Sequence, residues 1–362
     1  MRVVLAGGGT TGHISPLLAT AAALRLADPA GEIVCVGTPA GLETTLVPAA
    51  GYDLRLVDPV PLPRRVSAGL VTLPFRIVTS VRQAGAVLRD ARADVVVGFG
   101  GYASLPVFLA ARRAAIPVVV HEANAVPGLA NRIAARFAAR TCVAFANTGL
   151  KNQVVVGTPV RRGVADLDRG AARPAARTRF GLPVGAPVLL VSGGSQGARS
   201  LNRAVTGALP GLDAAGISVL HVTGPKNFEE PVELPLLTRS TYVRLPYVAA
   251  MEDAYAAADL MLARAGAATV TETALVGLPA LFVPLPHGNG EQAKNAAGVV
   301  AAGGGLLIAD ADLTPDRLVA EASRVFADPA VLARMSVAAR GVMPGDAAER
   351  VAAYALQAGG RQ

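Results

Sequence analysis

Two glycine-rich turns lie about half a chain apart, and each stands between an apolar run typical of a strand and a run typical of a helix. The first turn spans residues 7–13 (GGGTTGH), and the second spans residues 192–198 (SGGSQGA). Glycine lets the backbone approach a ligand closely, and the start of the following helix presents N–H groups to anions. Each turn opens its own series of alternating strands and helices. The pattern therefore predicts two Rossmann-like domains, an arrangement suited to joining two phosphorylated partners.

Length and composition set limits on the class of protein. A chain of 362 residues with 52% hydrophobic residues fits two well-packed domains. An uninterrupted apolar run of about 18 residues, as a transmembrane helix requires, is not found. Because aromatic residues make up only 4% and tryptophan is missing, no nucleic-acid partner is expected. Cys35 and Cys142 each fall in a predicted strand, and we expect buried, reduced thiols, as in cytoplasmic proteins.

Continuous Val and Leu runs, rather than strict alternation, predict strands buried on both faces of a parallel sheet. In the first half the expected strands are residues 3–6, 33–36, 54–57, 95–99, 118–121, 142–145 and 153–156. The expected helices between them are residues 14–26, 42–49, 72–92, 105–114 and 129–139. In the second half the expected strands are residues 187–191, 218–223, 241–245, 260–263, 280–283 and 305–308, with helices between them. The fold class is therefore α/β, with two doubly wound sheets.

The alternation of predicted strands and helices is interrupted once, and this interruption predicts the domain boundary. Residues 1–161 are expected to form the first domain, and residues 187–345 the second. The segment 162–186, rich in Ala, Arg and Pro, lacks a strong pattern and is predicted to be a linker. A final helix within residues 346–362 could pack back on the first domain.

Positive charge is concentrated in the first half of the chain. Residues 1–160 carry 15 Lys and Arg against 8 Asp and Glu, whereas residues 161–362 carry 19 against 18. The segment 59–89 has no acid, and it interleaves arginines with apolar residues. Its arginines are Arg64, Arg65, Arg76, Arg82 and Arg89, and its apolar residues include Leu70, Val71, Leu73, Phe75, Ile77 and Val78. If this segment is exposed, it would bind an anionic bilayer. An ordinary amphipathic helix with its apolar face in the core explains the same pattern equally well.

Polar residues and glycines gather just after the predicted strands, where ligands bind in sheets of this kind. In the first half these are residues 7–13, 98–104 and 121–124. In the second half they are residues 192–198, 264–272 and 284–292. Two Asp-x-Asp sequences, at 166–168 and 310–312, match a pattern of metal-using transferases, but neither follows a strand at this edge. Helix N-capping and linker solvation explain them better, so we expect no metal and no cofactor.

Seven motifs, in the same order as in a known family, occur along nearly the whole chain. The chain resembles the MurG family, the bacterial UDP-N-acetylglucosamine–lipid I transferases. The matching segments are residues 8–16, 100–102, 121–124, 157–161, 193–198, 264–272 and 292–296. The resemblance implies the GT-B fold, in which two Rossmann-like domains face a cleft. It also implies inverting, metal-independent transfer of GlcNAc from UDP-GlcNAc to the MurNAc 4-hydroxyl of lipid I, which forms lipid II for peptidoglycan synthesis.

The same resemblance implies where the enzyme works. It would be a peripheral protein on the cytoplasmic face of the cell membrane, serving cell-wall biogenesis and, through it, cell shape and division. Segment 59–89, with Arg112 and Arg113, would contact the anionic membrane surface. Other proteins of cell-wall synthesis are expected as partners.

The resemblance places the sugar donor in the second domain. Glu272 would accept hydrogen bonds from the ribose hydroxyls, the backbone around Val248 would read the uracil, and Gln292 would recognise sugar hydroxyls. The expected donor-binding residues are Thr10, Thr11, Gly12, Asn124, Arg161, Ser195, Gln196, Val248, Ala267, Ala268, Thr269, Val270, Thr271, Glu272 and Gln292.

His13 is the candidate general base, because an imidazole titrates near neutrality and this one ends the first glycine turn. Two other roles for it are stabilising the acceptor pyrophosphate and ordering the turn. Glu122 is a competing base, and Asn124 is a further catalytic candidate. The expected acceptor-binding residues are Gly9, Thr11, His13, Gly100, Gly101 and Tyr102.

The sequence departs from the family pattern at four positions. Thr11 stands where a glycine is usual, Ala123 where glutamine is usual, and Ala263 and Ala265 where serines are usual. Threonine requires a negative φ and adds bulk to the first turn. These changes admit a GT-B transferase that glycosylates a specialised or soluble natural product. A nucleotide-sugar-binding regulator is a third reading, which the retention of Glu272 and the other site residues disfavours.

Overall fold

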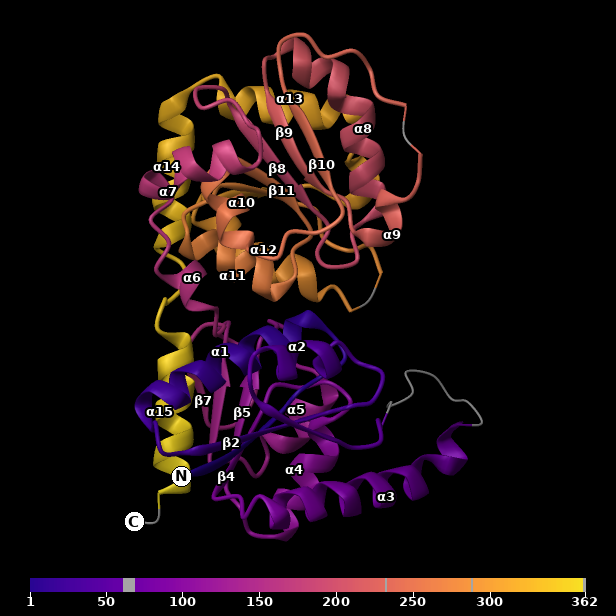
Figure 1. The fold of residues 1–362 in the computed structure, drawn as a ribbon, viewed down its shortest axis with the longest axis vertical. Coiled ribbons are helices and arrows are strands. Elements are labelled where there is room, and N and C mark those ends of the chain that lie inside the picture. The colour runs from indigo at the N-terminus through magenta and orange to yellow at the C-terminus, as the bar shows by residue number, and fades with distance from the viewer. Residues whose placement is uncertain (61–68, 232, 288, 361–362) are drawn as a thin grey trace. The chain divides into compact units, whose positions relative to one another are not determined.

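The three-dimensional structure is a computed structural model, and it describes residues 1–60, 69–231, 233–287 and 289–360. The chain divides into two compact units (Figure 1). The first unit comprises residues 1–161 together with 344–362, and the second comprises residues 162–343. Each unit is built on its own parallel sheet, which confirms the predicted α/β class with two doubly wound, Rossmann-like sheets.

The sheet of the first unit has the strand order β3-β2-β1-β4-β5-β6-β7, and its paired strands run parallel. The strands are β1 Arg2–Ala6, β2 Glu32–Gly37, β3 Asp53–Leu56, β4 Val95–Gly98, β5 Val118–Glu122, β6 Arg140–Val143 and β7 Gln153–Val155. The helices are α1 Thr11–Ala27, α2 Glu43–Ala49, α3 Gly69–Asp90, α4 Ser104–Arg113, α5 Leu129–Ala134 and α15 Ala347–Gly359. The strand order reverses between β1 and β4, and such a reversal marks the ligand-binding edge.

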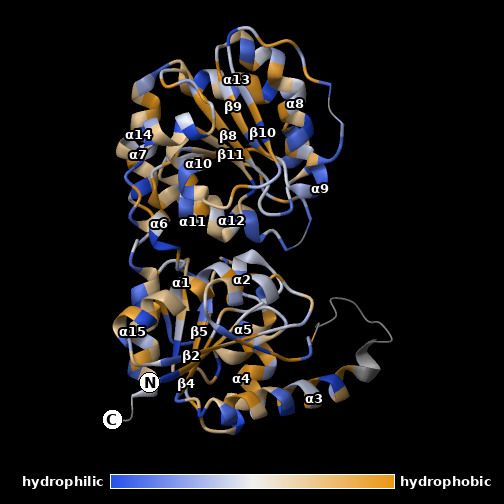
Figure 2. Ribbon diagram, in the orientation of Figure 1, coloured by the Kyte–Doolittle hydropathy of each residue, from blue (hydrophilic) through white to orange (hydrophobic). Residues whose placement is uncertain are grey.

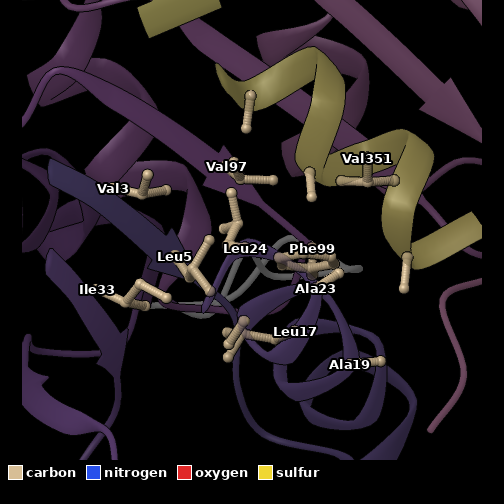
Figure 3. Packing of buried hydrophobic residues seen from close by; sticks show 14 of the residues in the cluster. Val3, Leu5, Leu17, Ala19, Ala23, Leu24, Ile33, Val97, Phe99 and Val351 are labelled. Carbon is tan, nitrogen blue, oxygen red and sulfur yellow. The ribbon is translucent and has the colours of Figure 1, made fainter. Parts of the chain in front are cut away.

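Helices cover both faces of this sheet, which explains why its strands are apolar without alternation. Leu5 packs with α1 and α15 on one face, while Val4 packs with α3 and α4 on the other. Helix α15 lies against α1 and β4, and Figure 3 shows its Val351 beside Val97 and Phe99. Val351 is 0% exposed, so its burial contributes roughly 1.5–3 kcal/mol to the first unit.

The sheet of the second unit has the order β10-β9-β8-β11-β12-β13 and is also parallel. Its strands are β8 Val188–Ser192, β9 Ser218–Val222, β10 Tyr242–Leu245, β11 Leu260–Ala263, β12 Ala280–Phe282 and β13 Gly305–Leu307. Its α-helices are α6 Arg162–Ala165, α7 Arg169–Arg179, α8 Arg199–Ala214, α9 Pro225–Phe228, α10 Met251–Ala257, α11 Ala267–Leu275, α12 Glu291–Ala301, α13 Pro315–Phe326 and α14 Pro329–Arg340. A 3₁₀ turn, η1, covers Asp310–Asp312. The strand order reverses between β8 and β11, at the second glycine turn.

The segment 162–186, expected to be a linker, instead contains α6 and α7 and belongs to the second unit. Asp168, whose Asp-x-Asp sequence was attributed to a solvated linker, instead caps α7 by accepting from the Ala171 N–H. The Arg169 side chain is buried, and its guanidinium donates to the carbonyl oxygens of Tyr255, Ala258 and Gly277. Arg177 pairs with Asp259 at 2.7 Å. Arginines that suggested a solvated linker therefore bind α7 to the second unit.

Both cysteines are free and buried, as predicted. Burial raises the pKa of the Cys35 and Cys142 thiols to about 12, so neither is a reactive thiolate near neutral pH. In the part of the chain that the structure describes, no helix combines the length and apolarity needed to cross a membrane.

Candidate functional site

The first glycine turn joins β1 to α1 and carries His13 at the start of the helix. Gly9 has a φ of +88°, and apart from its chain neighbours no described atom lies within 4 Å of where a Cβ would be. His13 Nδ1 lies 3.1 Å from the Gly8 carbonyl oxygen and 3.2 Å from Thr10 Oγ1. A proton on Nδ1 can be donated to the Gly8 carbonyl, in which case Nε2 is the nitrogen that accepts a proton.

Thr11, the unusual residue of this turn, lies at the first helical position of α1, after the N-cap residue Thr10. Helical φ is negative, which a β-branched residue adopts without strain, and the positive φ falls on Gly9 instead. Among the described residues, nothing accepts a hydrogen bond from the N–H of Thr11 or Gly12. The threonine therefore leaves these helix-end N–H groups available to an anion.

Glu43, which sequence reasoning missed, holds the first glycine turn through a hydrogen bond to its backbone. Its side chain is 0% exposed and accepts hydrogen bonds from Gly9 N at 2.9 Å and from Thr38 N and Oγ1 at 2.8 Å each. A Cβ at Gly8, Gly37 or Gly41 would lie 2.4 Å or less from it. Burial opposes ionisation of Glu43, but these hydrogen bonds outweigh it and hold its pKa below the usual range. The signal in the sequence was an acid that follows two glycines, Gly37 and Gly41, in the segment after a strand.

The Gly100–Gly101 turn after β4 packs directly on the first glycine turn. Gly100 and Gly101 have φ values of +91° and +84°, and a Cβ on Gly101 would lie 2.3 Å from the Gly8 carbonyl oxygen. A Cβ on Gly100 would lie 3.2 Å from His13 Nε2. Tyr102 is 54% exposed beside them. The expected acceptor-binding residues Gly9, Thr11, His13, Gly100, Gly101 and Tyr102 thus lie on adjoining loops of the first unit.

Glu122 ends β5 and organises the loop that follows it. Its buried carboxylate accepts from the N–H groups of Asn124 and Gly128 and from the amide of Asn131, each at 2.9 Å. Burial raises the pKa of Glu122, against the effect of these hydrogen bonds. A carboxylate so fully bonded shapes the loop and places Asn124. Asn131, another residue that the sequence reasoning missed, is 2% exposed and shares this network.

The second glycine turn, between β8 and α8, packs against the end of β9. Gly197 has a φ of +72°, and a Cβ there would lie 1.8 Å from the Thr223 carbonyl oxygen. The Asn227 amide donates to the carbonyl oxygens of Gln196 and Thr223. Ser195 is half-buried and Gln196 exposed. The turn is therefore held firmly in place while Ser195 and Gln196 remain accessible.

Helix α11 carries Glu272 as the sixth of its 9 residues. The Tyr255 hydroxyl donates to Glu272 Oε2 at 2.6 Å, and Tyr255 itself is 2% exposed. The N-cap is Gly266, so the N–H groups of the first helical residues point out of the helix end as anion donors. Of the first five residues, Ala267, Val270 and Thr271 are buried, and Ala268 and Thr269 are half-buried. Tyr255 was not foreseen, because it lies on α10, which a strand separates from α11.

Gln292 lies in the first turn of α12, and its orientation is fixed by the loop before it. Its Oε1 accepts from the Leu285 N–H at 2.9 Å, which leaves the amide NH₂ to donate. Val248 follows β10 and is 8% exposed. Asn295, fully buried on the same helix as Gln292, donates to the Ala265 carbonyl oxygen and so connects α12 to the turn before α11.

Arg264 binds together three loops of the second unit. It pairs with Asp310 at 2.6 Å, donates to Ser200 Oγ at 2.7 Å and donates to the Val283 carbonyl oxygen at 3.1 Å. Asp310 was expected to cap a helix, which is wrong: η1 has no side-chain cap, and the carboxylate is held by Arg264 and Ser200. Across the described ranges, no group of three or more His, Cys, Asp or Glu residues has the arrangement of a metal site.

The expected donor-binding residues divide between the two units. Thr10, Thr11, Gly12, Asn124 and Arg161 belong to the first unit, and the others belong to the second. Arg161 is exposed at the end of the first unit. Within the second unit, the second glycine turn, α11 and the start of α12 all follow parallel strands, at the edge where such sheets bind ligands.

The expected membrane-facing segment, residues 59–89, divides into two parts along α3. Its C-terminal half buries Ala84 and Leu88 in the core shared with α4. Its N-terminal half extends beyond the rest of the unit (Figure 1) and leaves Phe75 77% and Val78 49% exposed. Figure 2 shows hydrophilic and hydrophobic residues alternating along this helix. The core packing that one reading expected is therefore found in the C-terminal half of the helix, and the N-terminal half has the exposure that the other reading requires. Arg64 and Arg65 lie outside the described residues, while Arg76, Arg82, Arg89, Arg112 and Arg113 are exposed.

Comparisons with known proteins place both halves of the chain in one family. The glycosyltransferase family 28 N-terminal domain matches residues 3–143, and the glycosyltransferase family 28 C-terminal domain matches residues 188–351. A relative from Nocardioides sp. is 54% identical over 99% of this chain and 98% of its own, and one from Mycobacterium avium is 54% identical over 99% and 89%. Both are named UDP-N-acetylglucosamine–N-acetylmuramyl-(pentapeptide) pyrophosphoryl-undecaprenol N-acetylglucosamine transferase. The crystal structure of Acinetobacter baumannii MurG is similar over 98% of this chain and 99% of its own, with a TM-score of 0.78 and 30% identity.

Proposed function

Because the chain belongs to glycosyltransferase family 28, among the MurG transferases, we propose how its residues divide the work of one reaction. The enzyme transfers GlcNAc from UDP-GlcNAc to lipid I, which is undecaprenyl-pyrophosphoryl-MurNAc-pentapeptide, and so forms lipid II for peptidoglycan synthesis. The observation that carries this conclusion is 54% identity over nearly the full length of named transferases.

A transfer assay tests the reaction. Radiolabelled UDP-GlcNAc is incubated with a lipid I analogue, with an analogue that lacks the MurNAc 4-hydroxyl, and with a soluble aglycone. Label is expected in the product only with the intact lipid I analogue. Transfer to the soluble aglycone, without transfer to lipid I, would overturn the assignment and support the natural-product alternative.

We assign the donor to the second unit. Glu272, fixed by the Tyr255 hydroxyl, would accept hydrogen bonds from the two ribose hydroxyls. The N-terminus of α11 and the second glycine turn, with Ser195 and Gln196, would bind the diphosphate through N–H groups. The Gln292 amide NH₂ would donate to a sugar hydroxyl, and the backbone around Val248 would read the uracil.

We assign the base to His13. Attack of the MurNAc 4-hydroxyl on the sugar carbon inverts its configuration in a single displacement, and the attacking oxygen must lose its proton. The hydrogen bond of Nδ1 to the Gly8 carbonyl supports a tautomer whose Nε2 takes that proton. The bonds that surround the Glu122 carboxylate support a positioning role for it instead. Negative charge that develops on UDP would be stabilised by helix-end N–H groups and Arg161, without a metal ion.

We further propose that the N-terminal half of α3 contacts the cytoplasmic face of the membrane as a peripheral anchor. Phe75 and Val78 supply exposed apolar surface, and Arg76 and Arg82 supply charge attracted to anionic lipid. Sedimentation with anionic vesicles should fall as salt rises, and should be lost in a variant with Arg76→Glu and Arg82→Glu. Binding that is unchanged by these substitutions would refute the proposal.

A further inference from the structure

A cavity of about 380 Å³ lies in the first unit, outside the residues assigned above. One wall is α5 and the residues around it, from Val126 to Arg136. The other wall is the loop between β6 and β7, from Thr148 to Lys151. Both walls follow the carboxyl ends of neighbouring strands, β5 and β6, at the edge of the sheet that carries the first glycine turn. The cavity is therefore on the ligand-binding side of this sheet.

The charge of this cavity is entirely positive. Arg132, Arg136 and Lys151 line it, and no acidic residue does. None of the three side chains forms an ion pair with another residue in the described ranges. All three residues are exposed, and three cations that line one cavity without a counter-charge attract an anion. We call this cavity the basic pocket.

The walls of the basic pocket are held in place before any ligand binds. Glu122 accepts from Gly128 N and from the Asn131 amide, which fixes the segment that leads into α5. In the opposite loop, Asn147, Gly149 and Asn152 have φ values of +62°, +72° and +52°. Asn and Gly adopt this left-handed conformation most readily, so the loop has a defined path. The Thr148 hydroxyl also donates to Gln153 Oε1 at 2.6 Å.

The basic pocket continues the loop that carries Asn124, and its α5 wall also packs on α4, where the Arg112 guanidinium lies 4.9 Å from the centre of the Phe137 ring. Val126 and Pro127 line it only two and three residues after Asn124, in the loop that Glu122 organises. The exposed apolar residues of α3, Phe75 and Val78, lie on a different helix and do not line it. The short distance in sequence from Asn124 favours an anionic part of the acceptor as the ligand, and the vesicle measurement described below distinguishes it from a phospholipid headgroup.

We propose that the basic pocket binds a carboxylate of the acceptor's peptide. This inference rests on the proposed function, whose acceptor carries a pentapeptide. A peptide joined to the sugar by its N-terminus ends in a free carboxylate, and the planar Arg guanidinium binds carboxylates through two parallel hydrogen bonds. The basic pocket then recognises an acidic peptide and orients the acceptor from the end opposite its lipid.

The test is a variant with Arg132→Gln, Arg136→Gln and Lys151→Gln. Its matched control carries Arg92→Gln, Arg203→Gln and Arg334→Gln, three exposed arginines outside the pocket. With the pentapeptide acceptor, the pocket variant should show a KM raised roughly tenfold, with kcat and the KM for UDP-GlcNAc unchanged. With an acceptor that lacks the peptide, the variant and the wild type should have the same KM. The control variant should match the wild type with both acceptors.

Three outcomes would overturn the proposal. One is an unchanged KM for the pentapeptide acceptor, and another is an equal rise with the peptide-free acceptor. The third is weaker binding of the pocket variant to anionic vesicles, which would assign the basic pocket to a phosphate headgroup. Calorimetric titration with the free pentapeptide, and with the same peptide amidated at its C-terminus, measures binding without catalysis. A wild type that fails to transfer GlcNAc but binds only the free-acid peptide would refute the proposed function and leave the basic pocket standing.

Discussion

The buried carboxylate of Glu43 is expected to be the strongest single support of the first glycine turn. Its substitution by Gln keeps an oxygen for Thr38 but turns an NH₂ group toward the Gly9 N–H, so two donors face each other. A hydrogen bond to a charged group contributes about 1.5–3 kcal/mol, and Glu43→Gln should lower the stability of the first unit by roughly this amount. Glu43→Ala removes all three bonds and leaves buried N–H groups unpaired, at a cost of about 3–5 kcal/mol.

The pH dependence of the Glu43 variant gives an independent check. Hydrogen bonds from Gly9 and Thr38 hold the pKa of Glu43 in the folded protein below its ordinary value of about 4.5. The carboxylate therefore stabilises the fold above about pH 4.5, and this contribution is lost as the pH falls through the folded pKa. The difference in stability between the wild type and Glu43→Gln should be full at pH 7 and shrink below about pH 4.5.

Hydrogen exchange of residues 7–13, combined with urea unfolding, measures these effects in the first unit without assuming a single transition for both units. Glu43→Gln should also raise the KM for the acceptor, because the turn that carries His13 loosens. Thr38→Val is the matched control: it removes the Oγ1 donor, keeps the Gly9 bond, and should cost about 1 kcal/mol with normal kinetics. If the Glu43→Gln variant has the same hydrogen-exchange rates and the same KM for the acceptor as the wild type, this account of the turn is refuted.

Three further predictions follow from other contacts. Tyr255→Phe removes the hydrogen bond to Glu272 and should raise the KM for UDP-GlcNAc by roughly tenfold, with little change in kcat; a normal donor KM in steady-state kinetics would contradict this. His13→Gln should lower kcat by about 10²–10⁴ while leaving the donor KM intact, and a nearly normal kcat would exclude His13 as the base. Arg169→Met leaves three carbonyl oxygens of the second unit without their donor and should lower its melting temperature by several degrees, measured by calorimetry; an unchanged melting temperature would show that α7 does not need this contact.

Patterns within a short stretch of sequence predicted most of the fold. Strands buried on both faces were identified by uninterrupted apolar runs, and the two glycine turns lie where the strand order of each sheet reverses. The prediction failed at residues 162–186, because arginine usually indicates solvent. There, Arg169 and Arg177 instead satisfy buried carbonyl oxygens that are 80 or more residues away. Their partners could not be known before the sheet was assembled.

The candidate site shows the same division. Residues inside a motif, such as His13 and Glu272, could be proposed from the sequence because their chemistry and place after a strand are local properties. Glu43 and Tyr255 were missed, since each acts through a contact between separate elements: Glu43 with Gly9, 34 residues away, and Tyr255 with Glu272, 17 residues away. Residues that position other residues therefore need the structure to be recognised.

The place of α15 in the chain has a consequence for biosynthesis. Val351 and Ala355 complete the core of the first unit, yet they follow the whole of the second unit in sequence. A ribosome therefore delivers residues 162–343 before the part of this face that α15 covers, beside α1, can be buried. Domains usually fold in order from the N-terminus. Here the second unit can complete its core before the first unit does. Until α15 emerges, the nascent first unit leaves exposed the apolar surface that Val351 and Ala355 later bury, and such surface favours aggregation.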